Sequence, residues 1–462
     1  MTAPMTPQEA VERALATSTA DDCVVVASIT HTANLRWANN TLTTNGVTRS
    51  TDVTVISIVN GAETRAASLS RTGVDEADLV NLVEASRAAA AESPAADDAA
   101  PLVTAPAAAD WDDVPEDTSV QGLGAVAGGL ADAFGQAAAR DEGRYGFAEH
   151  AVTTTYLGSS TGLRLRDVQR DGRLELTGRS ADGSRSAWSG LRAEDAEALD
   201  VAGLERDVAQ RLDWSRKRVD LAAGRYETIL PPAAVADLMV DVYWSMGALD
   251  AHEGSTVYSR PGGGTRVGER LTDTPLTLRS DPTMPGLRCA PFVIAPVSSR
   301  LSSVFDNGLP LGSVDWISAG TLANLLQTRH SAAVTGLPAT PYVDNLALES
   351  PGATESVDDL VARTERGLLL TCLWYIRVVD PHSLLLTGLT RDGVFLVEHG
   401  EVVAAGTNFR FNESPVGMLR RVTAAGRSEE TFAREFGDYF TRTRMPALRI
   451  ADFNMSSVSQ AS

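Results

Sequence analysis

Six histidines are the residues best suited to hold a metal ion, and their spacing tests that chemistry. They are His31, His150, His252, His330, His382 and His399. Zinc peptidases place two histidines on one helix beside a glutamate that acts as general base. His252-Glu253 begins in this way, but Gly254-Ser-Thr256 follows, and no two histidines lie within a few helical turns. The sequence therefore predicts no local zinc site and leaves open only one assembled from distant segments.

Three glycine motifs come close to catalytic or phosphate-binding signatures. Gly158-Ser-Ser-Thr-Gly162 matches G-x-S-x-G, but a nucleophile at Ser160 would need a helix after the turn. Residues 163–166 instead alternate like a returning strand, which predicts a hairpin turn. Gly122–Gly128 misses the dinucleotide spacing by one residue and is interpreted as a helix start. Pro261–Gly264 lacks the Gly-Lys-Ser/Thr ending of a phosphate loop.

The cysteines offer no disulfide framework. Cys23, Cys289 and Cys372 are far apart, odd in number and outside any C-x-x-C pair. Each lies in an apolar stretch, which predicts buried, unreactive thiols. The sequence therefore shows no nucleophilic or thiol-based site.

The elements that would position these residues indicate an α+β fold. In the first half, helices are predicted over 7–16, 75–91, 123–139 and 194–219, and strands over 22–30, 33–38, 53–59, 147–156, 163–166 and 174–178. Turns are predicted at 39–40, 60–61, 158–162 and 171–172. The Ala-, Pro- and Asp-rich stretch 88–117 is interpreted as a surface excursion or a partly ordered linker.

The second half is richer in strands. A strand over 225–230 leads to a helix over 233–249, and a further helix is predicted over 356–365. Turns are predicted at 261–264, 306–308, 392–393 and 399–400. We therefore expect an N-terminal α/β domain over residues 1–222 and a β-rich C-terminal domain with a few helices over 223–462.

Composition narrows the class of partner and the location. The 462 residues carry 40 basic and 60 acidic side chains, so the formal charge is −20 and neither nucleic acid nor an anionic membrane is an expected partner. The start, Met1–Met5, has no basic or apolar leader pattern, and no stretch approaches 18 apolar residues, so a cytoplasmic location is expected. Lys217 is the only lysine among many arginines, which is typical of a high-GC bacterial genome.

Several segments, in order, resemble the TldD/PmbA family of metallopeptidase-related proteins. Arg225–Pro232, followed by an Ala-rich helix, resembles the family's strand and signature helix. Phe305–Pro310 resembles its Asp/Glu-Gly loop, with the acidic pair reduced to Asp306, and Trp316–Leu322 resembles the strands that follow. Thr387–Leu389 and Val397–Glu401 resemble its Thr-Gly-x-Phe and Glu-x-Gly-Glu segments. The resemblance covers nearly the whole chain.

The resemblance also implies where a zinc site would lie. In TldD-like members the signature helix carries H-E-x-x-x-H, and a later cysteine completes the site. Anchoring on Leu230-x-Pro232 places those three positions at Val240, Asp241 and Ser245. Valine cannot ligate zinc, serine is a poor ligand, and residues 439–462 contain no cysteine. This concerted loss resembles the TldE (PmbA) branch, whose members pair with a TldD-like subunit.

The resemblance implies a non-catalytic subunit of a heterodimeric peptidase that acts on unfolded or small, including modified, peptides. Neither catalytic residues nor a metal or cofactor is expected in this chain, and zinc is expected in an H-E-x-x-x-H partner. The candidate peptide- or partner-facing residues are Tyr243, Trp244, Asp306, Asn307, Asn408, Arg410 and Asn412. For residues 408–412 a half-buried strand is an equal interpretation, and for Asp306 and Asn307 the alternative is loop capping.

Two other functions stay open. One is a homodimeric peptide-binding or scaffold protein with no peptidase role. The other is an active hydrolase with a site assembled from distant segments. A neighbouring gene for an H-E-x-x-x-H homologue would favour the subunit, and stoichiometric metal on the isolated chain would favour the hydrolase.

Overall fold

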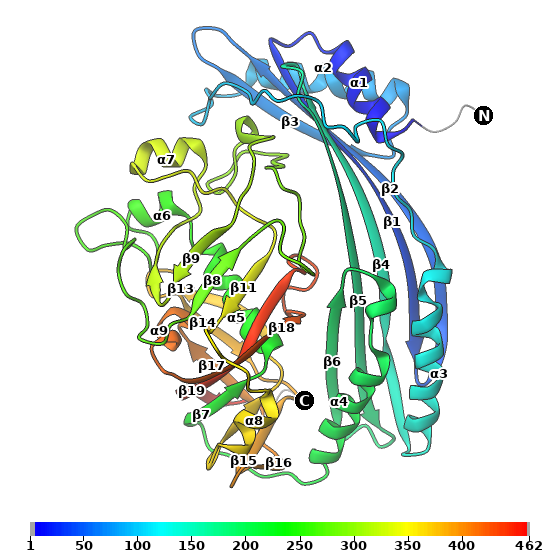
Figure 1. Cartoon of the computed structure of the whole chain (residues 1–462), viewed down its shortest axis with the longest axis vertical. Helices are drawn as coiled ribbons and strands as arrows, with labels where there is room; N and C mark the ends of the chain where they lie inside the picture. The colour runs from blue at the N-terminus through cyan, green and yellow to red at the C-terminus, as the bar shows by residue number, and fades with distance from the viewer. Residues whose placement is uncertain (1–4, 460–462) are drawn as a thin grey trace.

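A computed structural model describes residues 5–459, and its first half is built on one long antiparallel sheet. The strand order is β3-β2-β1-β4-β5-β6. The strands are β1 (Asp22–Ala38), β2 (Thr41–Val59), β3 (Arg65–Thr72), β4 (Glu142–Ser159), β5 (Arg164–Ser180) and β6 (Ser186–Ala193). Four of the six have 17 to 19 residues, so the sheet forms a tall curved wall along one side of the molecule (Figure 1).

Helices cover one face of this wall. They are α1 (Pro7–Thr17), α2 (Glu76–Glu92), α3 (Gly124–Ala138) and α4 (Val201–Trp214), with short 3₁₀ turns η1 (Val120–Leu123) and η2 (Ala196–Ala198). Alternate residues of β1 face them because successive side chains of a strand point to opposite sides. Cys23 and Val25 pack under α1 and α2, whereas Leu35 and Trp37 pack under α3.

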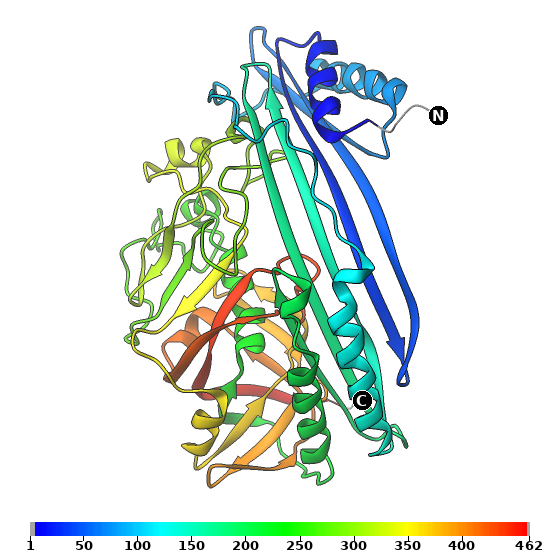
Figure 2. The same ribbon diagram turned by 45° about the vertical axis from the view of Figure 1, so that its right-hand side comes forward.

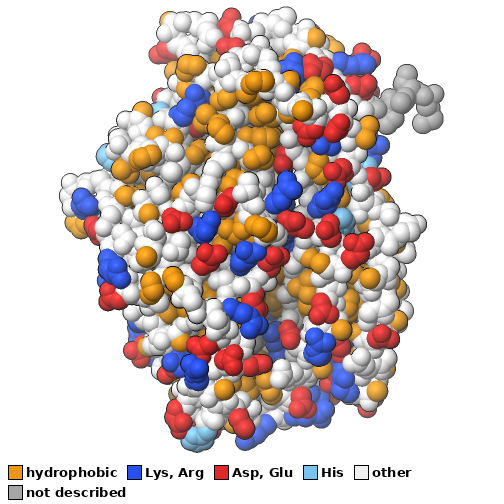
Figure 3. Space-filling view, in the orientation of Figure 1, with side chains coloured by type: hydrophobic (Ala, Val, Ile, Leu, Met, Phe, Trp, Pro, Cys, Tyr) orange, Lys and Arg blue, Asp and Glu red, His pale blue; other side chains and the backbone are white. Residues whose placement is uncertain are grey.

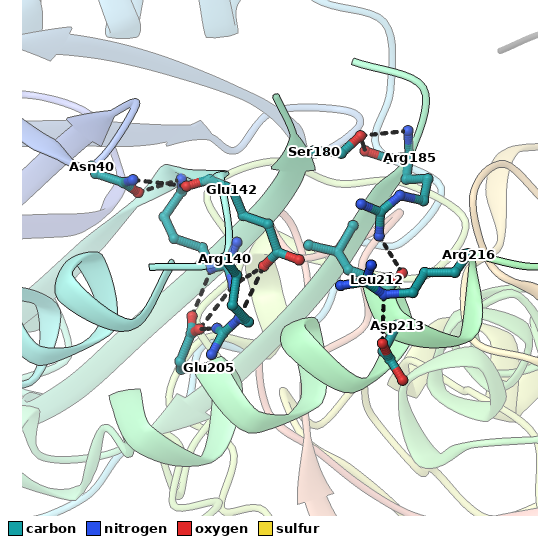
Figure 4. Close-up of polar contacts among 10 residues, drawn as sticks. Asn40, Arg140, Glu142, Ser180, Arg185, Glu205, Leu212, Asp213 and Arg216 are labelled. Atoms are coloured by element: carbon teal, nitrogen blue, oxygen red, sulfur yellow. Dashed lines mark hydrogen bonds and ion pairs between the residues drawn. The ribbon is translucent and has the colours of Figure 1, made fainter. Parts of the chain in front are cut away.

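A buried ionic network joins α4 to the start of β4 (Figure 4). The Arg144 side chain is fully buried, and its Nε donates to Glu205 Oε2 at 2.7 Å. Arg144 Nη2 also donates to Glu142 Oε2 at 2.9 Å, and Arg140 contacts both carboxylates. Further along α4, Arg185 donates to the Leu212 carbonyl oxygen at 2.7 Å. These contacts fix the helix against the sheet.

The second half of the chain packs on the opposite face of the wall, along β5 and β6. Arg173 Nη1 donates to Asp438 Oδ1 at 2.6 Å, and the Trp188 and Phe432 rings lie 6.2 Å apart. Near the upper end, Val24 and Leu157 of the sheet share an apolar cluster with Phe305. Figure 3 shows exposed hydrophobic side chains gathered at the upper middle of the molecule, whereas charged side chains of both signs are spread below them. The two halves therefore share an extended interface.

The second half folds around a 13-stranded mixed sheet. Its strands are β7 (Gly224–Leu230), β8 (Thr277–Ser280), β9 (Val314–Ser318), β10 (Thr321–Leu322), β11 (Leu346–Glu349), β12 (Arg366–Leu370), β13 (Trp374–Asp380), β14 (Leu385–Leu389), β15 (Val394–Glu398), β16 (Glu401–Ala405), β17 (Phe409–Glu413), β18 (Val422–Thr431) and β19 (Thr443–Val458). Its helices are α5 (Pro232–Trp244), α6 (Ala248–His252), α7 (Arg329–Thr335), α8 (Val357–Ala362) and α9 (Pro415–Leu419), with a 3₁₀ turn η3 (Val304–Asp306). The helix α5 lies inside the main core, where its middle turns are buried.

The α+β class is confirmed, and the helices predicted over 7–16, 75–91 and 123–139 agree with α1, α2 and α3 within about two residues. Side-chain caps explain two of these starts. Thr6 and Glu9 form a reciprocal capping box on α1, and Asp75 accepts from the Asp78 amide at α2. The hairpin turn at 158–162 is also confirmed, because β4 and β5 pair directly across it.

Several element boundaries were wrong. The two strands predicted over 22–30 and 33–38 are one strand, β1, and β2 begins at Thr41 rather than 53. Asp171-Gly172 is no turn but lies inside β5, where a Cβ on Gly172 would meet the Ala193 carbonyl oxygen at 3.0 Å. There the glycine permits close strand packing, which sequence cannot distinguish from a turn.

Three predicted helices are shorter than expected. The one over 194–219 reduces to η2 and α4, which begins where Asp200 accepts from the Gly203 amide. The helix over 233–249 splits into α5 and α6, and the helix over 356–365 reduces to α8. The helices end at Trp214, Trp244 and Ala362, and the residues that follow α4 and α8 are polar, so the predicted bounds were too wide.

The stretch 93–119 is irregular and crosses the surface of the sheet. Trp111 is buried against Tyr156, with ring centroids 5.4 Å apart, and Leu102 packs with the upper apolar cluster. It is therefore a surface excursion with anchored side chains, while residues 88–92 belong to α2. No helix within residues 5–459 is long and apolar enough to cross a membrane. The leader prediction rests partly on residues 1–4, outside the described residues.

Candidate functional site

The three positions that the resemblance assigned to zinc chemistry lie at the C-terminal half of α5. The Val240 side chain is fully buried in the main core. Ser245 lies just after the helix, and its hydroxyl donates to the Val242 carbonyl oxygen at 2.8 Å. Asp241 is the one carboxylate of the three. A helix with this surface packs a core and offers no pair of metal ligands.

Asp241 lies in a partly buried acidic group. Burial, with a smaller contribution from Glu435 and an opposing one from Arg377, raises the pKa of Asp241 to about 7. Its Oδ2 is buried without a hydrogen-bond partner in the described chain. One turn earlier, burial also raises the pKa of Asp237, whose Oδ1 accepts from the Glu435 amide at 2.9 Å. No local sequence pattern indicates this group, because Glu435 comes from a segment almost 200 residues away.

Glu435 in turn holds the start of β13. Its Oε2 accepts from the Tyr375 amide at 3.0 Å, and its Oε1 accepts from the Ile376 amide at 3.1 Å. Tyr375 has a φ of 53°, an uncommon conformation for an aromatic residue. Glu435 therefore connects α5 to the start of β13, where Tyr375 has a positive φ.

A cavity of about 440 Å³ lies beside the end of α5, between β5 and the second half. It is lined by Gln169, Trp244, Ala290, Phe292, Val293, Ile294, Ala295, Leu301, Ser302, Ser303, Asp306, Leu311, Thr328, Pro341, Tyr342 and Asp344. Its size and largely apolar, aromatic lining are typical of a site for a small ligand or a side chain. No histidine or cysteine is among the lining residues, and its titratable acidic groups are Asp306 and Asp344.

Two carboxylates at this cavity are already paired. Arg329 Nε donates to Asp306 Oδ1 at 2.7 Å, and the Arg329 amide donates to Asp306 Oδ2 at 3.1 Å. Arg442 Nη1 donates to Asp344 Oδ2 at 2.8 Å. Trp244 packs edge-on against Phe436, with ring centroids 5.0 Å apart. The walls are therefore held in place, and their charges are compensated before any ligand arrives.

The structure places the predicted peptide-facing residues in three different environments. Trp244 and Asp306 line the cavity together. Tyr243 is fully buried, and its hydroxyl donates to the Val343 carbonyl oxygen at 2.9 Å. Asn307 is buried too, and its amide bridges both backbone groups of Ala295. Tyr243 and Asn307 therefore cannot face a peptide in this conformation, and the capping interpretation fits Asn307 better.

Asn408, Arg410 and Asn412 do not line the cavity. Asn408 precedes β17 and accepts from the Asp392 amide at 3.2 Å, while Arg410 and Asn412 lie on the strand itself. Phe409 and Phe411, between them, are fully buried. The half-buried strand interpretation therefore describes this segment, although Arg410 stays exposed.

The remaining sequence candidates have structural explanations. Ser160 donates to Asp22 Oδ1 at 2.8 Å and joins the β4–β5 turn to the start of β1. All three cysteines are free and buried, and burial raises the pKa of Cys23 and Cys372 to about 11 and of Cys289 to about 12. The thiols are therefore protonated at neutral pH. Within residues 5–459, no three His, Cys, Asp or Glu side chains gather as a metal site.

Comparison with known families places the chain among metallopeptidase-related α+β proteins. The sequence-family model for the PmbA/TldA metallopeptidase C-terminal domain matches residues 223–457. The chain therefore belongs to the PmbA/TldD family. No curated protein sequence matches the chain.

Solved structures show the same fold over nearly the whole chain. TldE from Thermococcus kodakarensis superimposes with a TM-score of 0.73 at 14% identity, covering 96% of this chain and 98% of that one. A proposed modulator of DNA gyrase from Bacteroides thetaiotaomicron gives 0.76 at 13% identity, covering 98% of each chain. One from Thermotoga maritima gives 0.71 at 16% identity, covering 97% and 99%.

Proposed function

We propose that this chain is a non-catalytic, TldE-like subunit of a cytoplasmic, bacterial zinc peptidase complex that processes unfolded or small peptides. The observation that carries the proposal is which residues occupy the C-terminal half of α5 and the position just after it. At the positions that would hold zinc in a catalytic relative, Val240 is buried in the main core. The Ser245 hydroxyl donates to the Val242 carbonyl oxygen of the same helix. Zinc and the general base would belong to an H-E-x-x-x-H partner subunit.

The cavity beside Trp244 supports a role in peptide binding. An extended peptide presents side chains alternately on its two sides, and main-chain hydrogen bonds make strand-like capture tolerant of sequence. A pocket with aromatic walls and compensated carboxylates would accept one apolar side chain of such a peptide. In this arrangement the chain would control how a peptide reaches the active site, and the partner subunit would hydrolyse the peptide bond.

The test is a tagged pull-down from the native host, with mass spectrometry of the retained proteins. We expect a near-stoichiometric chain of similar length that carries H-E-x-x-x-H, and peptide hydrolysis that is lost on zinc chelation. The tagged chain purified alone is the control and should not hydrolyse the same peptide.

Recovery of the chain without such a partner would remove the main support for the subunit. The alternative, a homodimeric peptide-binding or scaffold protein, would then be favoured. Zinc bound stoichiometrically to the isolated chain would instead favour the unrecognised hydrolase.

A further inference from the structure

The cavity beside Trp244 has aromatic walls and a polar end, which together narrow the class of ligand that it can hold. Trp244, Phe292 and Tyr342 contribute rings from the second half. The loops that carry most of the lining residues lie along β5 of the first sheet (Figure 2), and Gln169 of β5 lines that side. Aromatic walls favour an aromatic guest, because edge-to-face and offset ring contacts add to the effect of the buried area.

The polar end is built around Asp344. Its Oδ2 accepts from Arg442 Nη1 at 2.8 Å, whereas its Oδ1 accepts no hydrogen bond within residues 5–459. The Asp344 side chain lines the cavity and is 41% exposed, so a ligand can reach it. Burial nonetheless raises the pKa of Asp344, although Arg442 opposes this. Burial and the charge of Asp344 also raise the pKa of Tyr342, so an aromatic ring and the free acceptor lie at the same end.

The charges around the cavity favour a neutral donor over a cation. Each of the two carboxylates that line the cavity has an arginine partner, Arg442 for Asp344 and Arg329 for Asp306. An ammonium or guanidinium group would therefore meet positive as well as negative charge. A hydroxyl group supplies one hydrogen bond to a carboxylate and adds no charge. The side chain that combines an aromatic ring with a hydroxyl group is that of tyrosine.

We infer that the cavity takes the side chain of a tyrosine in the bound peptide, with the phenol hydroxyl donating to Asp344 Oδ1. The inference rests on the proposed function and names the residue that the peptide would present. A phenylalanine would find the same aromatic surroundings, but it would displace water from Asp344 without replacing the hydrogen bond. Because hydrogen bonds to charged groups are among the stronger ones, phenylalanine should bind about 10- to 100-fold more weakly.

Isothermal titration calorimetry of the full-length chain, without any partner, tests this selectivity. The probes are capped tripeptides, acetyl-Gly-Xaa-Gly-amide, with tyrosine, phenylalanine, leucine or lysine at the centre. The tyrosine peptide should bind most tightly, by about 10- to 100-fold over the phenylalanine peptide. Equal binding of these two, tightest binding of the lysine peptide, or no binding of any probe at millimolar concentration would overturn the inference.

Removal of the acceptor tests the role of Asp344. Asp344→Ala should bind the tyrosine and phenylalanine peptides equally. Asp110→Ala is the matched control, because Asp110 forms an ion pair with Arg166 outside the cavity and its side chain is 45% exposed, against 41% for Asp344. This control should keep the native selectivity. Native selectivity in Asp344→Ala would count against a hydrogen bond to Asp344.

A second pair of variants tests the location without altering Asp344. Ala290→Trp fills part of the cavity and should abolish binding of the tyrosine peptide, whereas Ala131→Trp, at an exposed position on α3, should not. Tight binding by Ala290→Trp would place the peptide elsewhere and overturn the inference. Loss of selectivity alongside recovery of the H-E-x-x-x-H partner would overturn this inference alone. Selective binding without such a partner would support the tyrosine site and remove the subunit role.

Discussion

Single substitutions on α5 decide what chemistry this region can support. Val240, which the resemblance aligns with a zinc-binding histidine, is fully buried. Asp241 keeps a carboxylate, but it lies beside Glu435 rather than beside metal ligands. A carboxyl group in this setting prefers its protonated form, because burial and a neighbouring negative charge both disfavour ionisation.

Asp241 should make stability depend on pH. Its pKa is about 7 in the folded chain and near 3.8 when unfolded, so the folded state binds the proton more tightly between these values. Stability should therefore fall as the pH rises from about 4 to 7, by at most about 1.4 kcal/mol per pH unit, and then level off. Denaturant unfolding of the native chain and of Asp241→Asn should show a shallower slope in the variant, where only the remaining buried carboxyl groups such as Asp237 contribute.

The control for this experiment is Asp132→Asn on the exposed side of α3. It should keep the native slope, since an exposed carboxylate is solvated in both states. Equal slopes in Asp241→Asn and the native chain would show that Asp237, rather than Asp241, takes up the proton.

At the scale of elements, α4 is held by charge as well as by apolar contacts. Its Val208 and Leu212 pack into the core under the sheet, while Glu205 neutralises the buried Arg144. A buried ion pair adds little over an apolar pair of the same size, but removing one partner leaves an uncompensated charge.

Glu205→Gln should therefore be strongly destabilising, by about 3–5 kcal/mol in the free energy of unfolding. The cause is Arg144, which would keep its charge with only Glu142 as an acidic contact. Denaturant unfolding measures the change, and Glu84→Gln on the exposed side of α2 is the matched control. A loss below about 1 kcal/mol would mean that water or Glu142 compensates the charge of Arg144.

At the scale of the molecule, one arginine links the two halves of the chain. Arg434 lies 4.6 Å from the Trp188 ring of β6 and 4.9 Å from the Trp374 ring of β13. It also donates to the Cys372 sulfur. Desolvated cation–π contacts of this kind contribute about 2 kcal/mol, so Arg434 should stabilise the docking of the second half on the sheet.

Arg434→Ala should therefore lower the thermal unfolding midpoint and increase proteolysis of residues 215–223, between α4 and β7. Arg410→Ala, at an exposed arginine, is the control and should change neither. Cleavage in this connection would also test the predicted domain division at residue 222. An unchanged midpoint in Arg434→Ala would show that the remaining interface, which includes Arg173 and Asp438, suffices.

The sequence determined the features that depend on local contacts. Caps such as Thr6 and Asp75 set where helices begin, and alternation marked most strands of the first half. The ordered motifs of the second half indicated the family, and the absence of paired histidines followed from spacing. Each of these signals lies within a few residues, where backbone geometry limits the choices.

Only the tertiary structure decided which distant residues meet. Trp244 reaches the cavity shared with Asp306, while its neighbour Tyr243 turns into the core, although both were equal candidates by sequence. The acidic group needs Glu435 beside α5, and β3 pairs only with residues 52–59 of the longer β2. Pairing over long separations depends on the packing of the whole chain, which no local pattern encodes.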